Sequence, residues 1–176
     1  GARWASAAHL AGEGPPMVIL GMDDGVRLLA AEPVDLAYPA GEPPLSPEGF
    51  LAADLDNDRR PDLLLVGARG LRLYRQMEDG AFQAVNDKTG LDATVLDAAY
   101  RGAWSLDLDL DGDLDVALGV AQGKPPVLRN NGDGSWAVAE PFDMDGLNRL
   151  IWTDFDGDGD GDVVARDAAG RLVRLD

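Results

Sequence analysis

Short apolar segments, bounded by glycine and aspartate, recur along the 176-residue chain. Short runs of branched and aliphatic residues next to glycine are typical of β-strands. The clearest runs each follow an aspartate directly, and they predict strands at 63–68 (LLLVGA), 116–121 (VALGVA) and 163–168 (VVARDA). No segment shows a convincing amphipathic helical period, so the pattern predicts an all-β protein.

Further strands are predicted around each of these three runs. The preceding strands are GFLAAD (49–54), GAWSLDLD (102–109) and LIWTDFD (150–156). The following strands are GLRLYRQ (70–76), PPVLRNN (125–131) and GRLVRLD (170–176). Two units continue through Asp-Gly pairs, which suit tight hairpins, into AFQAVN (81–86) and SWAVAE (135–140). Each unit is therefore expected to form a four-stranded antiparallel sheet, and the last unit lacks its fourth strand.

The segments between the first and second strands carry closely spaced aspartates. DFDGDGDGD places carboxylates on alternate residues from Asp154 to Asp162, and related segments begin at Asp54 and Asp107. Carboxylates about 5 Å apart repel by roughly 3 kcal/mol per pair at an effective dielectric near 20. A bound cation would offset this repulsion, and Ca²⁺ suits the segment because it accepts many oxygen ligands in irregular geometry. A solvated turn explains one copy equally well, but three copies favour calcium.

The spacing predicts a ligand set for each acidic loop. Positions one, three, five and nine supply carboxylates, and a glycine at position six turns the backbone so that the carbonyl of position seven faces the same centre. The predicted ligands are Asp54, Asp56, Asp58, Arg60 and Asp62 in the first loop, Asp107, Asp109, Asp111, Asp113 and Asp115 in the second, and Asp154, Asp156, Asp158, Asp160 and Asp162 in the third.

The first acidic loop departs from this pattern. Arg59 occupies position six, where the other loops have Gly112 and Gly159, and a side chain disfavours a positive φ. Two arginines also follow Asp58 directly and would partly neutralise the loop. We therefore expect two well-formed Ca²⁺ sites and a third, weaker site in the first loop.

The residues of the loops and the distance between loops exclude other calcium-binding motifs. An EF-hand needs flanking helices and a glutamate at position twelve, where this chain has Leu65, Leu118 or Ala165. The loops recur after 53 residues (Asp54 to Asp107) and 47 residues (Asp107 to Asp154), which is far longer than a nonapeptide β-helix repeat. A period near 50 with several short strands is typical of propeller blades.

These motifs resemble a known family, the FG-GAP or VCBS repeats of β-propellers, which occur in integrin α-subunit heads and many bacterial surface proteins. The resemblance covers residues 48 to 176, and is carried by the DxDxDGxxD loops at Asp107–Asp115 and Asp154–Asp162, the looser loop at Asp54–Asp62, and the segments VLRNNGDGSW and LYRQMEDGAF. It implies structural Ca²⁺ within each blade and an interaction surface on the rims, and it provides no catalytic residues.

The first 47 residues are expected to form one more blade, which is degenerate. When Gly21 is aligned with Gly119, the four carboxylate positions are occupied by His9, Ala11, Glu13 and Met17. This blade is expected to keep its sheet without calcium. His9, the only histidine, is interpreted as an ordinary residue at the end of a strand.

The expected architecture is a single β-propeller domain, or a segment of one, over residues 1–176. Its blades would span approximately 1–47, 48–98, 99–145 and 146–176. An open array of four blades exposes strand edges and end faces. The ring could close within the chain, form from two chains as a homo-oligomer, or continue into a longer propeller, which we favour.

Composition and charge limit the expected binding partners and the expected cellular location of the protein. The formal charge is −17, and fourteen of the 32 acidic residues lie in the three loops (four, five and five). Without a basic patch, nucleic acid is not an expected partner. The chain has no cysteine and no apolar run that would insert into a membrane. Weak oxygen-only calcium sites fill where Ca²⁺ is millimolar, so an extracellular, periplasmic or cell-surface location is expected.

Two classes of function fit this sequence. The favoured one is a non-enzymatic binding or adhesion module for a protein or glycan, because calcium spacing explains the regular carboxylates and leaves no unrepeated acidic pair for acid-base catalysis. The alternative is a catalytic or non-catalytic propeller part of a larger secreted carbohydrate-processing enzyme. The large rings of Trp104, Trp136 and Trp152 are expected to pack between blades rather than bind a ligand.

Overall fold

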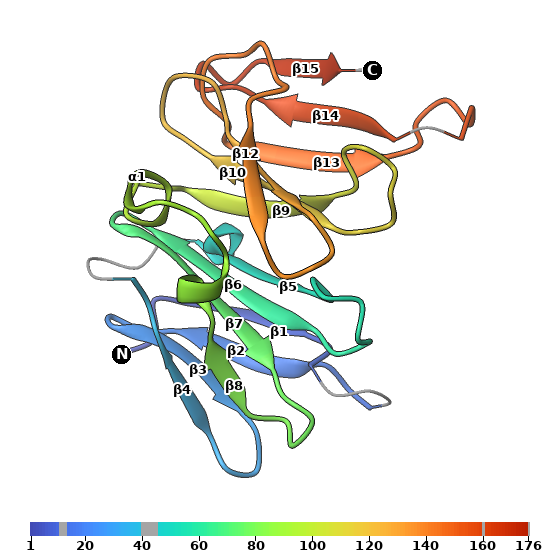
Figure 1. Ribbon diagram of the computed structural model, residues 1–176. Helices are drawn as coiled ribbons and strands as arrows, with labels where there is room; N and C mark the ends of the chain where they lie inside the picture. Colours follow the sequence, from blue (N-terminus) through green and yellow to red (C-terminus); the bar gives the residue numbers. More distant parts are fainter. Residues whose placement is uncertain (11–13, 40–45, 160, 176) are drawn as a thin grey trace.

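The protein is a stack of four antiparallel sheets, each built from consecutive strands (Figure 1). A computed structural model describes residues 1–10, 14–39, 46–159 and 161–175. Within these residues, three sheets have four strands and the last has three. The prediction of an all-β propeller segment, with an intact first sheet and an incomplete last one, is confirmed.

The strand bounds follow the predicted apolar runs. The first sheet contains β1 (Trp4–Ala8), β2 (Met17–Gly21), β3 (Gly25–Leu29) and β4 (Val34–Ala37). The second contains β5 (Phe50–Ala53), β6 (Asp62–Gly67), β7 (Gly70–Gln76) and β8 (Phe82–Ala84). The third contains β9 (Gly102–Leu106), β10 (Asp115–Gly119), β11 (Val127–Asn130) and β12 (Trp136–Ala139). The fourth contains β13 (Arg149–Thr153), β14 (Asp162–Arg166) and β15 (Leu172–Leu175).

Helical structure in the described residues is limited to single turns. These are α1 (Ala93–Leu96) and two 3₁₀ turns, Pro47–Gly49 and Asn86–Lys88. The side chain of Asp92 caps α1 by accepting hydrogen bonds from the backbone N–H groups of Thr94 and Val95. No helix in the described part of the chain is long and apolar enough to cross a membrane.

The sheets converge along their first strands. β5 contacts β9, and β9 contacts β13. At this inner side, Glu48 accepts a hydrogen bond of 2.8 Å from Nε1 of Trp104 and one of 2.6 Å from the guanidinium of Arg149. One carboxylate therefore connects the second, third and fourth sheets.

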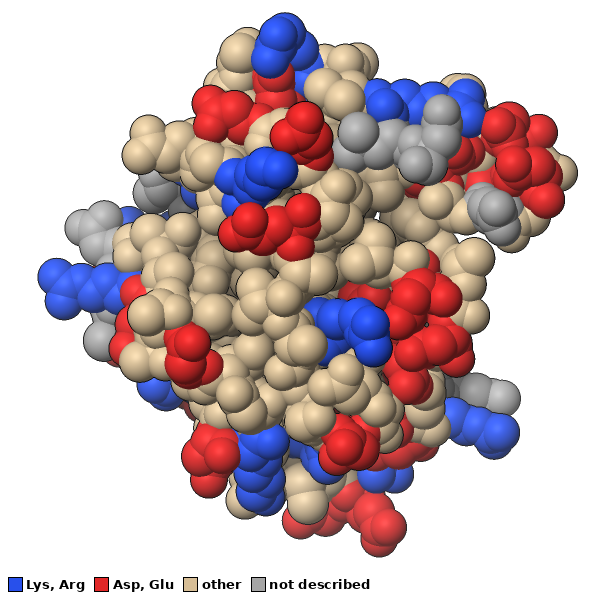
Figure 2. Space-filling model, turned by 45° about the horizontal axis from the view of Figure 1, so that its top comes forward, with Lys and Arg blue, Asp and Glu red and all other residues tan. Residues whose placement is uncertain are grey.

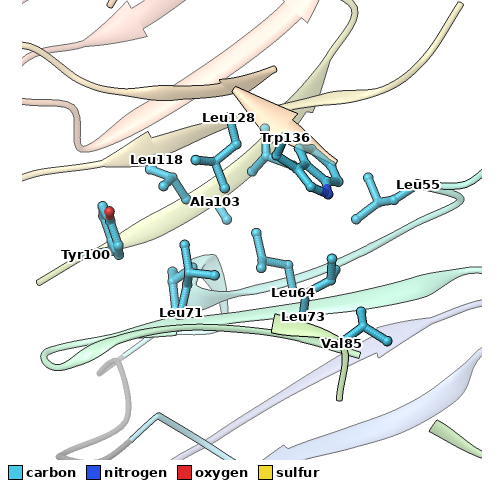
Figure 3. Close-up of a cluster of buried hydrophobic side chains, with 12 residues drawn as sticks. Leu55, Leu64, Leu71, Leu73, Val85, Tyr100, Ala103, Leu118, Leu128 and Trp136 are labelled. Atoms are coloured by element: carbon cyan, nitrogen blue, oxygen red, sulfur yellow. The ribbon is translucent and has the colours of Figure 1, made fainter. Parts of the chain in front are cut away.

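Neighbouring sheets bury apolar side chains from both faces of the central strands. In β6, Leu63 and Leu65 pack toward the first sheet, whereas Leu64 and Val66 pack toward the third. Figure 3 shows the second of these layers, in which Leu64 and Trp136 approach from opposite sheets. Because each fully buried aliphatic side chain contributes roughly 1.5–3 kcal/mol, the double burial of the central strands is the main source of cohesion between blades.

The tryptophans pack between sheets, as predicted. Trp136 is buried in the layer between the second and third sheets. Trp104 and Trp152 are partly buried against the layer between the third and fourth. A Cβ atom at Gly161 would lie only 2.1 Å from Nε1 of Trp152, so the ring position requires glycine there.

The first sheet keeps the blade topology without the acidic loop. Met17 pairs with Ala8 at the register position where Asp62 pairs with Ala53. The alignment that places Met17 at a ligand position is therefore supported by the strand register. Two other aligned residues, Ala11 and Glu13, lie outside the described residues.

Candidate metal centre

All three acidic loops connect the first strand of a sheet to its second strand, and they project from the same side of the stack (Figure 1). Acidic side chains gather on this side, at the right of Figure 2. The predicted strands extend into these loops, but β9 ends at Leu106 and β13 at Thr153. The strands end there because the next aspartate binds backbone N–H groups of the loop itself.

The aspartate at position one organises each loop. Asp54 accepts hydrogen bonds from the backbone N–H groups of positions five and six, at 3.0 and 2.8 Å. Asp107 accepts the same pair at 3.2 and 3.1 Å. Asp154 accepts from position six at 3.2 Å and from position four at 2.6 Å. This carboxylate therefore holds the loop in a tight backbone turn without the help of a bound ion.

Two residues of every loop adopt a positive φ. At position six, φ is 70° for Arg59, 90° for Gly112 and 97° for Gly159. The predicted strain at Arg59 is thus present. At position four, φ is 57° for Asn57, 56° for Leu110 and 80° for Gly157. Sequence reasoning missed position four, although asparagine in one loop and glycine in another are the residues that tolerate this conformation.

The aspartate at position nine fastens the loop to the sheet. Asp62 accepts hydrogen bonds from the backbone N–H groups of Leu55, at 3.3 Å, and of Gln76, at 2.9 Å. Asp115 accepts from Leu108 at 3.0 Å and Asn130 at 2.8 Å. Burial raises the pKa of Asp62 to about 6 and also raises the pKa of Asp115. Both carboxylates are buried, and both of their oxygens already accept backbone hydrogen bonds.

The carboxylates at positions one, three and five converge in the first two loops. One oxygen from each residue lies within 4.8 Å of the others in the groups Asp54, Asp56, Asp58 and Asp107, Asp109, Asp111. In the third loop the corresponding group is Asp154, Asp156 and Asp162. These groups do not include Asp62, Asp115 or Asp158. Asp160 lies outside the described residues.

Two of the three residues predicted to supply a backbone carbonyl, Arg60 and Asp113, lie in the described part of the chain, and their side chains make other contacts. The guanidinium of Arg60 pairs with the carboxylate of Asp58, in agreement with the expectation that the arginines after Asp58 partly neutralise it. Oδ1 of Asp113 accepts a hydrogen bond from the amide of Asn57 in the preceding blade. This second contact joins two acidic loops, which the sequence spacing did not predict.

Each acidic loop also has an arginine from the third strand of its own sheet. Arg75 lies 2.9 Å from a carboxylate oxygen of Asp56, and Arg129 lies 3.4 Å from one of Asp109. Arg174 contacts Asp156 at 2.7 Å and Asp162 at 3.1 Å, and its guanidinium lowers the pKa of Asp156. Sequence reasoning missed these pairs, although the segments LYRQ, VLRN and LVRL all carry the arginine.

A side-chain amide connects each of two loops to the following blade. The Nδ2 group of Asn130 donates a 2.7 Å hydrogen bond to the carbonyl of Leu55, at position two of the first acidic loop. The Nε2 group of Gln76 donates one of 2.8 Å to the carbonyl of Leu10, at the same position in the first blade. The first blade therefore has the same inter-blade hydrogen bond at position two as the first acidic loop.

The oxygen donors fit a hard cation. In the first loop, Oδ1 of Asp56 is buried and has no hydrogen-bond partner among the described residues. Burial is the main reason that the pKa of Asp56 is raised. A buried oxygen without a partner costs about 1–3 kcal/mol, and a cation held among Asp54, Asp56 and Asp58 would satisfy it. A donor set made only of carboxylates favours the hard cations Ca²⁺ and Mg²⁺ over softer metals.

Comparison with protein families agrees with this geometry. A family model described as an FG-GAP-like repeat matches the chain twice, over residues 54–118 and 107–165. The first match begins at position one of the first acidic loop, and the second begins at position one of the second. A comparison with curated proteins gives no match.

Proposed function

The chain belongs to the FG-GAP-like repeat family, and from that premise we propose that it is a calcium-stabilised β-propeller module that acts by binding and not by catalysis. The observation that carries the calcium proposal is the convergence of three carboxylates in each acidic loop. The buried and unpartnered Oδ1 of Asp56 supports it independently.

Calcium would act by removing repulsion within a loop that the backbone has already shaped. The position-one aspartate and the two positive-φ residues hold the turn, so binding need not order a flexible segment. Ca²⁺ fits better than Mg²⁺ because it accepts irregular, many-oxygen coordination, whereas Mg²⁺ retains several waters. We expect the second loop to bind more strongly than the first, where Arg60 and Arg75 already neutralise Asp58 and Asp56.

Thermal melting of matched variants tests the calcium role. Asp109 is the best residue to replace, because its carboxylate belongs to the converging group and its ion pair with Arg129 is long, at 3.4 Å. Asp109→Asn should reduce the rise in melting temperature that calcium produces, and should leave the melting temperature in chelator nearly unchanged. Asp143→Asn is the control, since its side chain is 95 % exposed and lies outside the loops. Equal calcium responses in both variants would contradict the proposal.

We propose a protein or a glycan as the binding partner, in an extracellular, periplasmic or cell-surface setting. Oxygen-only calcium sites of extracellular modules typically bind at about 10⁻⁴–10⁻³ M, which suits such compartments. A formal charge of −17 and an acidic loop side argue against nucleic acid. In the described residues, the convergent acidic groups all belong to the repeated loops, which supports a role without catalysis.

Binding and catalysis are distinguished by a paired assay. The protein is screened on a glycan array and against immobilised matrix proteins, in calcium and in chelator, and in parallel with chromogenic glycosides. Calcium-dependent retention without glycoside turnover is the expected result. Turnover that survives purification and is lost on replacing one loop aspartate would contradict the non-enzymatic assignment.

A further inference from the structure

A pocket of about 120 Å³ lies between the second and third sheets, beside the first acidic loop. Its apolar wall is formed by Leu55, Leu73 and Val85 from the second blade and by Trp136 from the third. Sites for drug-sized ligands have volumes of roughly 300–1,000 Å³. The pocket is therefore suited to a smaller group, the size of one ring or one side chain.

The indole N–H of Trp136 is a polar group at this pocket. The residue is only 8 % exposed, and Figure 3 shows its nitrogen on the edge of the ring toward Leu55 and Leu73, which line the same pocket. Among the described residues this N–H donates no hydrogen bond, whereas the indole N–H of Trp104 donates one to Glu48. Because a buried indole N–H ordinarily has a partner, a ligand atom in the pocket would satisfy it.

Packing between the blades does not require this N–H. Trp136 pairs with Asn130 at the register position where Phe82 pairs with Gln76 in the second sheet. Phe82 packs against the equivalent layer, between the first and second sheets, and its ring has no polar atom. The ring of Trp136 thus explains the contact between sheets, and its N–H is available for a different role.

Charged side chains of both signs also line the pocket. Arg75 and Lys88 contribute two cations, and Asp62 and Asp133 contribute two carboxylates, so their formal charges cancel. Lys88 is exposed, and its ammonium group makes no ion pair with another described residue. Oδ1 of Asp133 accepts hydrogen bonds of 2.9 and 2.6 Å from the backbone N–H and the hydroxyl of Ser135. Its Oδ2 therefore remains as an acceptor for a ligand.

We propose that this pocket binds one neutral sugar unit of a glycan. A hydroxyl group both donates and accepts hydrogen bonds, so a sugar can accept from Trp136 and Lys88 and donate to Asp133, while its C–H groups pack against the apolar wall. A charged ligand fits less well, because it would lie beside a side chain of its own sign. This inference rests on the proposed binding role, for which it selects the glycan, and does not depend on calcium.

Nuclear magnetic resonance of isotope-labelled protein in chelator tests this inference. The methyl glycosides of glucose, galactose, mannose and N-acetylglucosamine are added one at a time, up to about 10⁻² M, and methyl glucuronide is the charged counterpart. At least one neutral glycoside should shift the signals of the Trp136 indole N–H and of the backbone N–H of Gly134, which lines the pocket. Absence of a shift with every sugar, or a stronger response to the glucuronide, would overturn the proposal.

Two variants test the named donors. Trp136→Phe removes the N–H and keeps a ring of the type that Phe82 provides, and Lys88→Gln removes the charge. Each should weaken binding about fivefold, followed at Gly134, because each removes one hydrogen bond to the sugar. Lys124→Gln is the matched control, since it removes the same charge from a 51 % exposed side chain that pairs with Asp143, and it should bind like the wild type. Equal affinities in Lys88→Gln and Lys124→Gln would contradict the assignment, as would an unchanged affinity in Trp136→Phe.

The glycan array separates failure of this site from failure of the proposed function. Retention of a glycan on the array without a shift at Trp136 would exclude this pocket as its site and leave the binding role intact. A protein that retains neither a glycan nor a protein partner would contradict the proposed function itself.

Discussion

The first and second acidic loops have nearly the same backbone but different charge neutralisation. In both, position one accepts backbone hydrogen bonds, positions four and six have positive φ, and position nine is fastened to the third strand. In the first, however, Arg60 and Arg75 pair with two of the three converging carboxylates. In the second, Arg129 lies 3.4 Å from Asp109, and within the described residues the carboxylate of Asp111 accepts only a hydrogen bond from the backbone N–H of Asp113. Loop shape is therefore set by hydrogen bonds, and we expect the arginines to set the affinity of each loop for a cation.

The third loop extends this comparison toward the surface. Its residues from Asp154 to Gly159 are exposed, while it keeps the same position-one and position-nine hydrogen bonds. No described sheet follows the fourth one, and Phe155 remains exposed. Whether a loop is buried thus depends on the blade that packs against it, and not on the sequence of the loop.

The largest expected effect on stability comes from removing the hydrogen bonds that the position-nine aspartate accepts. Asp115→Ala leaves two buried backbone donors without partners and should lower the free energy of unfolding by on the order of 3 kcal/mol. Asp62→Ala should cost a similar amount, because both loops use the same bonds. Urea denaturation of both variants in chelator measures the two losses. A large difference between them would show that loop shape is not set in the same way.

The next effect is a dependence on pH in the metal-free protein. The pKa of Asp62 is raised to about 6, so the native state binds a proton more tightly than the unfolded chain, whose aspartate pKa is about 3.9. The stabilising contribution of this group is therefore complete below about pH 4 and is lost as pH rises through 6. The free energy of unfolding of the wild type, minus that of Asp62→Asn, should fall by on the order of 2 kcal/mol across this range. A difference that rises with pH would contradict the role of burial at Asp62.

A smaller effect is expected from the converging carboxylates. Asp109→Asn should weaken calcium binding at the second loop at least about tenfold, or roughly 1.4 kcal/mol. Asp56→Asn should weaken the first loop less, since Arg75 already pairs with that carboxylate. Competition with a fluorescent calcium chelator measures the calcium affinity of both variants. A greater loss for Asp56→Asn would reverse the expected order of the two sites.

The smallest effect tests the arginines directly. Arg75→Gln should strengthen calcium binding at the first loop about fivefold, because removing a cation beside the site removes roughly 1 kcal/mol of repulsion. Arg69→Gln removes the same charge from the exposed β6–β7 turn and is the control. Equal affinities in the two variants would mean that Arg75 does not tune the site.

The blade pattern could be predicted from the sequence because it depends on local signals. Apolar runs after each aspartate define the second strands, and GLRLYRQ coincides with β7. The Asp-Gly turns have the positive φ they predict, 82° at Gly80 and 87° at Gly134. The first strands were predicted too long, because an aspartate within an alternating pattern gives no sign that its carboxylate will bind the backbone of the following turn.

The site was predicted less completely because its details depend on contacts between strands. The spacing identifies the converging carboxylates, but the same spacing also suggests Asp62 and Asp115 as ligands, while the structure uses both of their oxygens to fasten the loop. The pairing of Arg75 with Asp56 depends on the register of β6 against β7. The exposure of Phe155 depends on which sheet follows, which no local pattern encodes.

Calorimetric titration of chelator-treated protein with calcium, in the presence and absence of competing magnesium, is the most direct test of calcium binding by the repeated loops. We predict two or three sites per chain, a preference for Ca²⁺ over Mg²⁺, and one site fewer in Asp109→Asn but not in Asp143→Asn. Absence of calcium binding, or a stoichiometry that Asp109→Asn leaves unchanged, would contradict the assignment and identify the acidic loops as solvated turns.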